Sequence, residues 1–274
     1  MKEYSTDKIR NVVLASHSGA GKTILCEAFL HATGATTRMG KIEDGTTVSD
    51  FDEEEIRRTI SLSTSVIPVE YRDTKINFLD TPGYTDFIGE VISAMRVVDS
   101  VILMVDAVNG LEVGTEIAMD YCSKFNLPRV LVINKMDRDN ANFQKTLKSV
   151  EDFSDVRLIP IQLPWGKKQD FKGVIDLISM KAYKAQGKTA EEIPAEYKDA
   201  AEEARMKLVE AAAEGDDTLL EKYLDSGSLT DEEVVRGLNE VVKACGFVPV
   251  LVSAGSSETG VLKLLDAVIE ILPS

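Results

Sequence analysis

The hydrophobic residues of this chain fall into short apolar runs that alternate with amphipathic segments. Runs typical of strands buried on both faces occupy residues 11–14, 100–106, 129–134 and 247–252. Segments with a helical spacing of apolar positions lie between these runs and after the last, at residues 24–30, 88–97, 113–125 and 261–272. This alternation predicts right-handed crossovers and an α/β fold with a doubly wound, mostly parallel sheet.

One pair of strands is expected to depart from the parallel arrangement. Residues 65–71 and 75–80 are strand-like and are joined by a short polar turn, which predicts an antiparallel pair. Because Pro68 has no N–H to donate to a strand ladder, we expect residues 65–71 to form an edge strand. Before this pair, residues 34–50 predict a mobile surface loop, and residues 52–61 a short solvated helix.

The regular alternation stops between about residues 155 and 246. Strand-like runs are followed there by helical segments, at residues 156–163, 173–177 and 180–184 and then at 195–214, 218–224 and 230–244. We therefore expect residues 156–245 to form an inserted α+β subdomain. The remaining segments, 1–155 and 246–274, would form the main domain.

A glycine-rich segment, residues 15–23, joins the first predicted strand to the first helix. It ends in Gly-Lys-Thr but has Ser16 where the motif G-x-x-x-x-G-K-[ST] has its first glycine, so an ordinary turn is the alternative. Lys22 would neutralise the β- and γ-phosphates of a nucleotide, and Thr23 would offer its hydroxyl to Mg²⁺. Backbone N–H groups at a helix start surround phosphate oxygens. The expected phosphate-binding residues of this P-loop NTPase fold are Ser18, Gly19, Ala20, Gly21, Lys22, Thr23 and Ile24.

Two polar segments directly follow predicted strands. Asp80 precedes Thr-Pro-Gly-Tyr, at a place where nucleotide-binding sheets contact Mg²⁺ and the γ-phosphate. Asn134 ends the strand at residues 129–134, and Lys135 and Asp137 follow it. A carboxylate at Asp137 can accept both N–H groups of guanine's N1 and N2, which adenine does not offer, and this disfavours an ATPase or kinase. Asn134 and Lys135 can brace the loop and cover the base.

A third polar segment, Ser253, Ala254 and Gly255, follows the last predicted strand. Its small residues could place a backbone N–H against the guanine carbonyl. An ordinary strand-to-helix turn is the alternative, and taken alone this segment favours that turn.

Charge and composition limit the choice of partners. The formal net charge of the 274 residues is −15, so we expect no general affinity for nucleic acid or anionic membranes. The cysteines, Cys26, Cys122 and Cys245, lie far apart within apolar segments, which favours buried reduced thiols. With a polar start and no apolar run that could span a bilayer, the sequence predicts a cytoplasmic protein.

In this order the motifs resemble the G domain of a translational GTPase, specifically that of elongation factor G. Residues 161–166, Ile-Gln-Leu-Pro-Trp-Gly, together with residues 173–177, look like the start of that family's inserted G′ subdomain. The resemblance covers essentially the whole chain. Residues 265–274 look like the boundary before a β-barrel domain, so the resemblance implies that further domains follow in a longer factor.

The resemblance also implies roles for single residues. Thr23, Ser61 and Asp80 would hold Mg²⁺, with Thr59 less suitable than Ser61 by register. The catalytic set would be Lys22, Gly83 and Tyr84.

The chain departs from the family pattern at three positions. Gly19 replaces an aspartate implicated in monovalent-cation binding, and Ser18 replaces an apolar residue of the family's hydrophobic gate. Tyr84 replaces the histidine that orients the attacking water. These departures point to the type-2, elongation factor G-like branch.

The sequence therefore predicts a Mg²⁺-dependent GTPase that acts as a conformational switch on the ribosome. We expect slow intrinsic turnover, because neither an arginine finger nor the histidine is apparent. The alternative is a binding module whose nucleotide state controls partner affinity with little or no GTP hydrolysis.

Overall fold

A seven-stranded sheet forms the centre of the molecule. The computed structural model describes residues 2–185, 187 and 189–274. The strand order is β2-β3-β1-β4-β5-β11-β6, and every neighbouring pair is parallel except β2 and β3. The strands are β1 (Ile9–Ala15), β2 (Ser65–Tyr71), β3 (Thr74–Asp80), β4 (Ser100–Asp106), β5 (Arg129–Asn134), β6 (Arg157–Pro160) and β11 (Phe247–Val252). The predicted α/β fold and its antiparallel edge strand, which contains Pro68, are confirmed.

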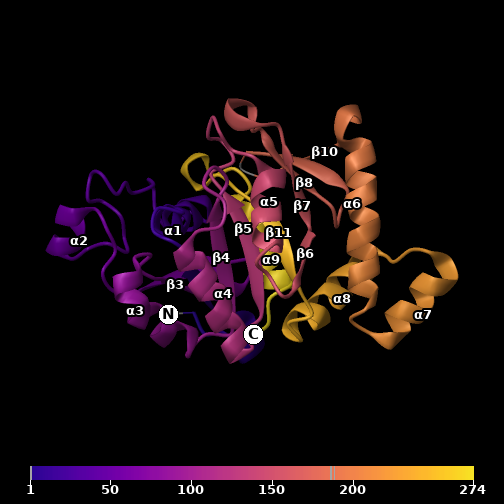
Figure 1. The fold of residues 1–274 in the computed structure, drawn as a ribbon, viewed down its shortest axis with the longest axis horizontal. Helices are drawn as coiled ribbons and strands as arrows, with labels where there is room; N and C mark the ends of the chain where they lie inside the picture. The colour runs from indigo at the N-terminus through magenta and orange to yellow at the C-terminus, as the bar shows by residue number, and fades with distance from the viewer. Residues whose placement is uncertain (1, 186, 188) are drawn as a thin grey trace.

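Helices cover both faces of this sheet (Figure 1). Alternate residues of one strand belong to different hydrophobic clusters, Val12 and Leu14 to one and Val13 and Ala15 to the other. The first cluster includes residues of α1 (Lys22–Ala32) and α9 (Val261–Glu270). The second includes residues of α3 (Ile88–Met95), α4 (Val113–Phe125) and α5 (Phe143–Glu151). Both faces are therefore buried, which explains the continuous apolar runs of β4, β5 and β11.

Helix α5 was not predicted from the sequence. Its buried residues, Phe143, Thr146, Leu147 and Val150, recur with the spacing of one helical face. The side chain of Asn142 accepts a hydrogen bond from the Lys145 backbone N–H at 3.0 Å and caps the helix. Both signals are present in the sequence.

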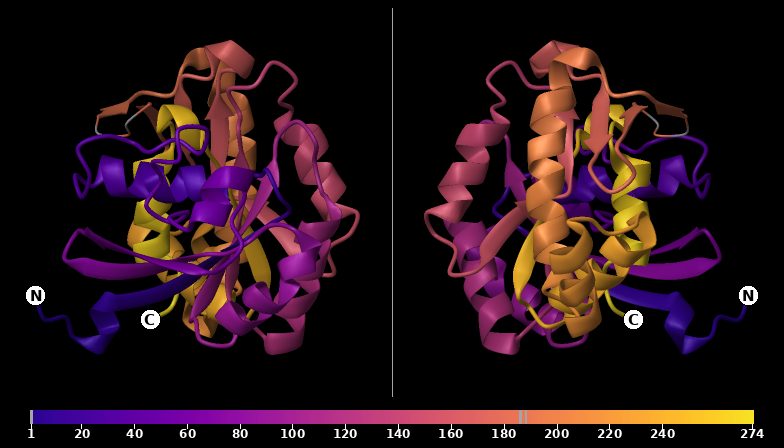
Figure 2. Two further views of the ribbon diagram at one scale, coloured as in Figure 1. Left: turned by 90° about the vertical axis from the view of Figure 1, so that its left-hand side faces the viewer. Right: turned by 90° about the vertical axis from the view of Figure 1, so that its right-hand side faces the viewer.

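A second, four-stranded antiparallel sheet and three helices form the insert, at the opposite end of the molecule from α2 (Figures 1 and 2). Its strand order is β10-β9-β8-β7. The elements are β7 (Gln162–Trp165), β8 (Gly173–Asp176), β9 (Lys181–Lys184), β10 (Ala190–Glu191), α6 (Ala195–Ala213), α7 (Asp217–Ser226) and α8 (Asp231–Lys243). This confirms the inserted α+β part of the fold.

The expected strand at residues 156–163 is two strands in two different sheets. β6 pairs with β11 at the edge of the large sheet, and β7 pairs with β8 in the small one. Ile161 lies between them: its N–H donates to Val250 O at 2.9 Å, and its carbonyl accepts from Leu177 N at 3.0 Å. A single continuous apolar run therefore contributes strands to both sheets.

The remaining elements are short. Helix α2 (Glu53–Arg58) begins at a capping box formed by Asp52 and Glu55. The 3₁₀ turns are Thr6–Lys8, Thr85–Phe87, Lys168–Asp170 and Gly255–Ser257. Among the helices that the structure describes, none combines the length and apolarity needed to cross a bilayer.

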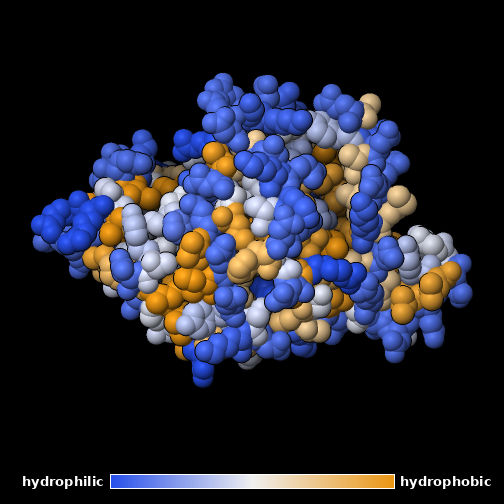
Figure 3. All heavy atoms as spheres, in the orientation of Figure 1, coloured by the Kyte–Doolittle hydropathy of each residue, from blue (hydrophilic) through white to orange (hydrophobic). Residues whose placement is uncertain are grey.

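The surface drawn in Figure 3 is largely hydrophilic, with scattered hydrophobic areas. One such area lies over α7, whose Leu220 and Leu224 are exposed. Two of the cysteines, Cys26 and Cys122, are buried as expected, whereas Cys245 is partly exposed.

Candidate nucleotide-binding site

The start of α1 is open to an anion. Its N-cap residue is Gly21, no side chain caps the helix, and its first turn contains no acidic residue. The backbone N–H groups of this turn and the positive end of the helix dipole can therefore face a phosphate. Gly21 has φ 99°, and a Cβ there would lie 2.7 Å from Asn134 Nδ2, so the loop needs glycine at this position.

Lys22 is buried, with its ammonium among neutral oxygens of the loop. Its Nζ donates to Ser16 Oγ at 3.0 Å and to the carbonyls of Ser16 and His17 at 3.3 Å. Burial lowers the pKa of Lys22 to about 8, opposed by the nearby charge of Asp80. A polyphosphate would supply the anionic partner that these neutral oxygens do not.

The three expected Mg²⁺ ligands lie together. Thr23 Oγ1 donates to Asp80 Oδ2 at 2.8 Å and lies 3.3 Å from Ser61 Oγ. Asp80 Oδ1 is buried and has no hydrogen-bond partner among the described residues, and burial raises the pKa of Asp80 to about 6. Hydroxyl and carboxylate oxygens suit Mg²⁺, which keeps several waters and phosphate oxygens in its shell. These residues fit the ion.

Asp50 is an acidic residue of this region that the sequence reasoning missed. It is buried and lines the same cavity as Thr23 and Ser61. Burial raises the pKa of Asp50, and the hydroxyl of Ser61 opposes this rise. In the sequence, Asp50 is one acidic residue of a polar loop, and no local pattern distinguishes it from its neighbours.

Asn134 connects three loops on the guanine side of the site. Its Nδ2 donates to Ala20 O at 2.9 Å, and its Oδ1 accepts from Ser253 Oγ at 2.9 Å and from Gly255 N at 3.1 Å. The amide thus braces the phosphate loop, as predicted, and also fixes the segment after β11.

The two residues expected at the base itself are held in position. Lys135 has φ 63° and donates from Nζ to Asp106 Oδ2 at 2.8 Å. Asp137 Oδ2 accepts from Ser256 Oγ at 3.2 Å, while its Oδ1 is buried without a partner in the described part of the chain. An unpaired buried acceptor is costly unless a ligand donates to it. Guanine N–H groups would satisfy this oxygen.

The backbone of the segment after β11 is already hydrogen-bonded. The N–H groups of Ser253, Ala254 and Gly255 donate to Ile133 O, Thr259 O and Asn134 Oδ1. In this conformation the segment positions Asn134, and its contact with guanine stays a prediction.

Most of the predicted phosphate and switch residues surround one cavity of about 370 Å³. Those that line it are Ser18, Gly19, Gly21, Lys22, Thr23, Ile24, Ser61, Gly83, Tyr84 and Lys135. Ile42, Glu43 and Arg138 also line it and were not predicted. Tyr84 is 44% exposed at the edge of this cavity.

The loop that was expected to be mobile is held by Glu27 of α1. Glu27 is 1% exposed, and its carboxylate accepts from Gly40 N at 2.7 Å and from Val48 N at 2.6 Å. Thr47, Ser49 and Asp50 of the same loop are buried. The signal in the sequence was a carboxylate within an otherwise apolar helix.

We expect a Glu27→Ala variant to release this loop. Each hydrogen bond to a charged group contributes about 1.5–3 kcal/mol, so local opening should become at least tenfold more frequent. Trypsin cleavage after the exposed Arg38 and Lys41 measures the opening directly. Glu221→Ala, at an exposed position on α7, is the matched control and should leave the cleavage rate unchanged. Equal cleavage of both variants would show that Glu27 does not hold the loop.

The fold and the site together define a P-loop domain built to bind a guanine nucleotide. The sequence model described as "Elongation factor Tu GTP binding domain" matches residues 7–274, and the chain belongs to that family. The predicted resemblance to an elongation factor G-like G domain is thereby confirmed.

A crystal structure of a protein from Thermus thermophilus is similar over almost the whole chain. The TM-score is 0.91, the sequence identity is 35%, and the match covers 98% of this chain and 41% of that protein. The chain therefore spans about two fifths of the length of that protein.

Proposed function

We propose that this chain is the Mg²⁺-dependent, GTP-hydrolysing switch of a type-2, elongation factor G-like factor, and that it acts on cytoplasmic ribosomes. One observation carries the proposal. A Cβ at Gly83 would lie 2.6 Å from Lys22 Nζ and 2.7 Å from Ser18 N, so the segment after β3 packs directly on the phosphate loop. A γ-phosphate bound to Lys22 would therefore lie beside that segment, and its loss could release the segment.

Each residue then has a definite part in GTP hydrolysis. Lys22 and the N–H groups at the start of α1 stabilise charge on the phosphates as water attacks in line. Thr23, Ser61 and Asp80 would hold Mg²⁺, which neutralises phosphate charge when bound. The Tyr84 hydroxyl, at the cavity edge, can hydrogen-bond the attacking water. A phenol is a weaker base than imidazole, so we propose slow intrinsic turnover.

The alternative proposal is a nucleotide-controlled binding module with little turnover, and Tyr84 is the observation that favours it. Multiple-turnover phosphate release, measured with and without ribosomes on the complete factor, separates the two. Stimulated release that disappears in Lys22→Ala supports the enzyme. Tight GTP binding without release under either condition supports the module.

A Tyr84→His variant tests the role of the tyrosine. Because an imidazole positions and activates water better than a phenol, ribosome-stimulated release should rise by at least about tenfold. GDP affinity should not change, since Tyr84 is not among the guanine-contacting residues. An unchanged or slower stimulated rate would contradict the assigned role.

A further inference from the structure

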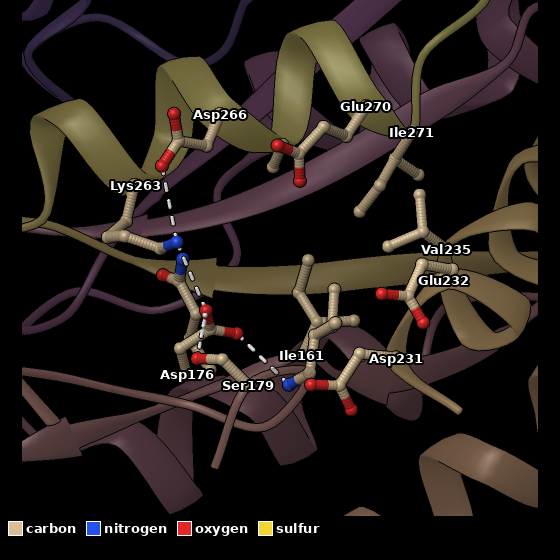
Figure 4. Close-up of a pocket in the computed structure, with 13 residues that line it drawn as sticks. Ile161, Asp176, Ser179, Asp231, Glu232, Val235, Lys263, Asp266, Glu270 and Ile271 are labelled. Carbon is tan, nitrogen blue, oxygen red and sulfur yellow. Dashed lines mark hydrogen bonds and ion pairs between the residues drawn. The ribbon is translucent and has the colours of Figure 1, made fainter. Parts of the chain in front are cut away.

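A second cavity, of about 400 Å³, lies where the insert meets α9 (Figure 4). Residues of β7, the β8–β9 turn, α8 and α9 line it, and none of them lines the nucleotide cavity. Ile161 and Ile271 are buried apolar residues of its wall. Its volume is in the range of sites that bind small groups.

Carboxylates dominate the charge of this cavity. Among the described residues, Lys263 is the one basic residue that lines it, and its Nζ is shared between Asp176 at 3.1 Å and Asp266 at 3.2 Å. Figure 4 shows the carboxylates of Glu232 and Glu270 turned toward the cavity from two different helices. Glu270 pairs with Arg72 at 2.8 Å, whereas Glu232 forms no ion pair within the described ranges. Arg72 also pairs with Asp266, and Asp231 pairs with Arg205 at 2.8 Å, so the unpaired Glu232 gives the opening its remaining negative charge.

Gln162 supplies a hydrogen-bond donor that has no partner among the described residues. Its side chain lines the cavity although the residue is only 2% exposed. Its Oε1 accepts from Val252 N at 3.3 Å, which fixes the orientation of the amide. The Nε2 donates to no described residue and is not fully enclosed by protein atoms. The missing partner of Gln162 is a hydrogen-bond acceptor.

We propose that this cavity binds a lysine or arginine residue of a partner polypeptide. The cation lies beside Glu232 and Glu270, the aliphatic stem packs on Ile161 and Ile271, and the backbone carbonyl accepts from Gln162 Nε2. A nucleic acid does not fit, because the same carboxylates repel its phosphates. A simple polyamine does not fit either, because its protonated nitrogens offer no acceptor to Gln162.

The test uses the whole chain with bound GDP and two short capped peptides, acetyl-Gly-Arg-Gly-amide and its citrulline twin. Titrations followed by amide NMR should shift resonances of α8, α9 and β7 with the arginine peptide, and the shifts should weaken at high ionic strength. The citrulline peptide keeps the shape and the carbonyls but lacks the charge, so it should bind more weakly. Equal binding of the two peptides, or no shift at these elements, would overturn the proposal.

Variants of the carboxylates locate the binding site. Glu232→Gln and Glu270→Gln should each reduce affinity by about fivefold at most, the range for partly exposed ion pairs. Glu240→Gln, further along α8 and outside the cavity, is the matched control. Gln162→Leu should weaken both peptides, since both present the carbonyl, and its melting curve shows whether it still folds. Wild-type affinity in the Glu232→Gln/Glu270→Gln double variant would refute the assignment even if Gln162→Leu does not fold.

Discussion

Replacing Asp137 with asparagine should weaken GTP binding by about a hundredfold to ten-thousandfold, the value of two hydrogen bonds to a charged acceptor. Asp137 Oδ1 is buried and unpaired among the described residues, and guanine offers it N–H donors. An asparagine has an NH₂ group in place of one carboxylate oxygen, so one guanine N–H would face a donor instead of an acceptor. Xanthine carries a carbonyl at C2 in place of the amine, so xanthosine nucleotides should become the preferred ligands.

Equilibrium titrations with guanosine and xanthosine diphosphates measure this change of preference. Asp139→Asn is the matched control, because Asp139 is exposed and, within the described residues, its carboxylate accepts only from Gln169, at 3.0 Å. The control should keep the guanine preference. If Asp137→Asn also kept the guanine preference, the base would not lie against Asp137, and the assigned guanine contact would be wrong.

A Gly83→Ala variant should lose GTP hydrolysis by about a hundredfold, the usual effect of misplacing a catalytic group by about 1 Å. The added Cβ would lie 2.6 Å from Ser18 Cα as well as from Lys22 Nζ. The backbone of Ser18 cannot yield as a flexible side chain does, so the segment after β3 must move away from the phosphate loop. GDP affinity should change much less, because the guanine contacts lie elsewhere.

Single-turnover hydrolysis and GDP titrations, run on the same preparation, separate the two effects. Gly89→Ala is the control, because a Cβ at Gly89 of α3 meets no atom within 4 Å. It should hydrolyse GTP at the wild-type rate. A Gly83→Ala variant with normal hydrolysis would mean that this contact is broken in the active state.

The order of the motifs was enough to predict which residues lie together around the candidate site. Thr23 and Asp80 are far apart in sequence, yet they meet because the parallel strands β1 and β3 end at one edge of the sheet, and Ser61 reaches them from the loop after α2. Strands β5 and β11 were predicted with their observed bounds, since continuous apolar runs between polar turns are strong local signals. Helix α5 has a different local signal, the helical spacing of its buried residues after the Asn142 cap, and was not predicted.

Other features depend on tertiary contacts that no local pattern encodes. Glu27 acts on Gly40 and Val48, so its role follows only from how the loop returns over α1. Similarly, the hydrogen bond that orients the Gln162 amide forms only because β7 lies beside β11. The apolar run at residues 156–163 contains no local signal that it divides at Ile161 between two sheets.

The single residue between β6 and β7 has a consequence for folding cooperativity. Because Ile161 bonds to Val250 on one side and Leu177 on the other, no flexible linker separates the two sheets at this point. One hydrophobic cluster also contains Leu14 of β1 together with Leu208 of α6 and Val234 of α8. The insert and the large sheet should therefore unfold as one unit, and excising the insert would expose part of their common core.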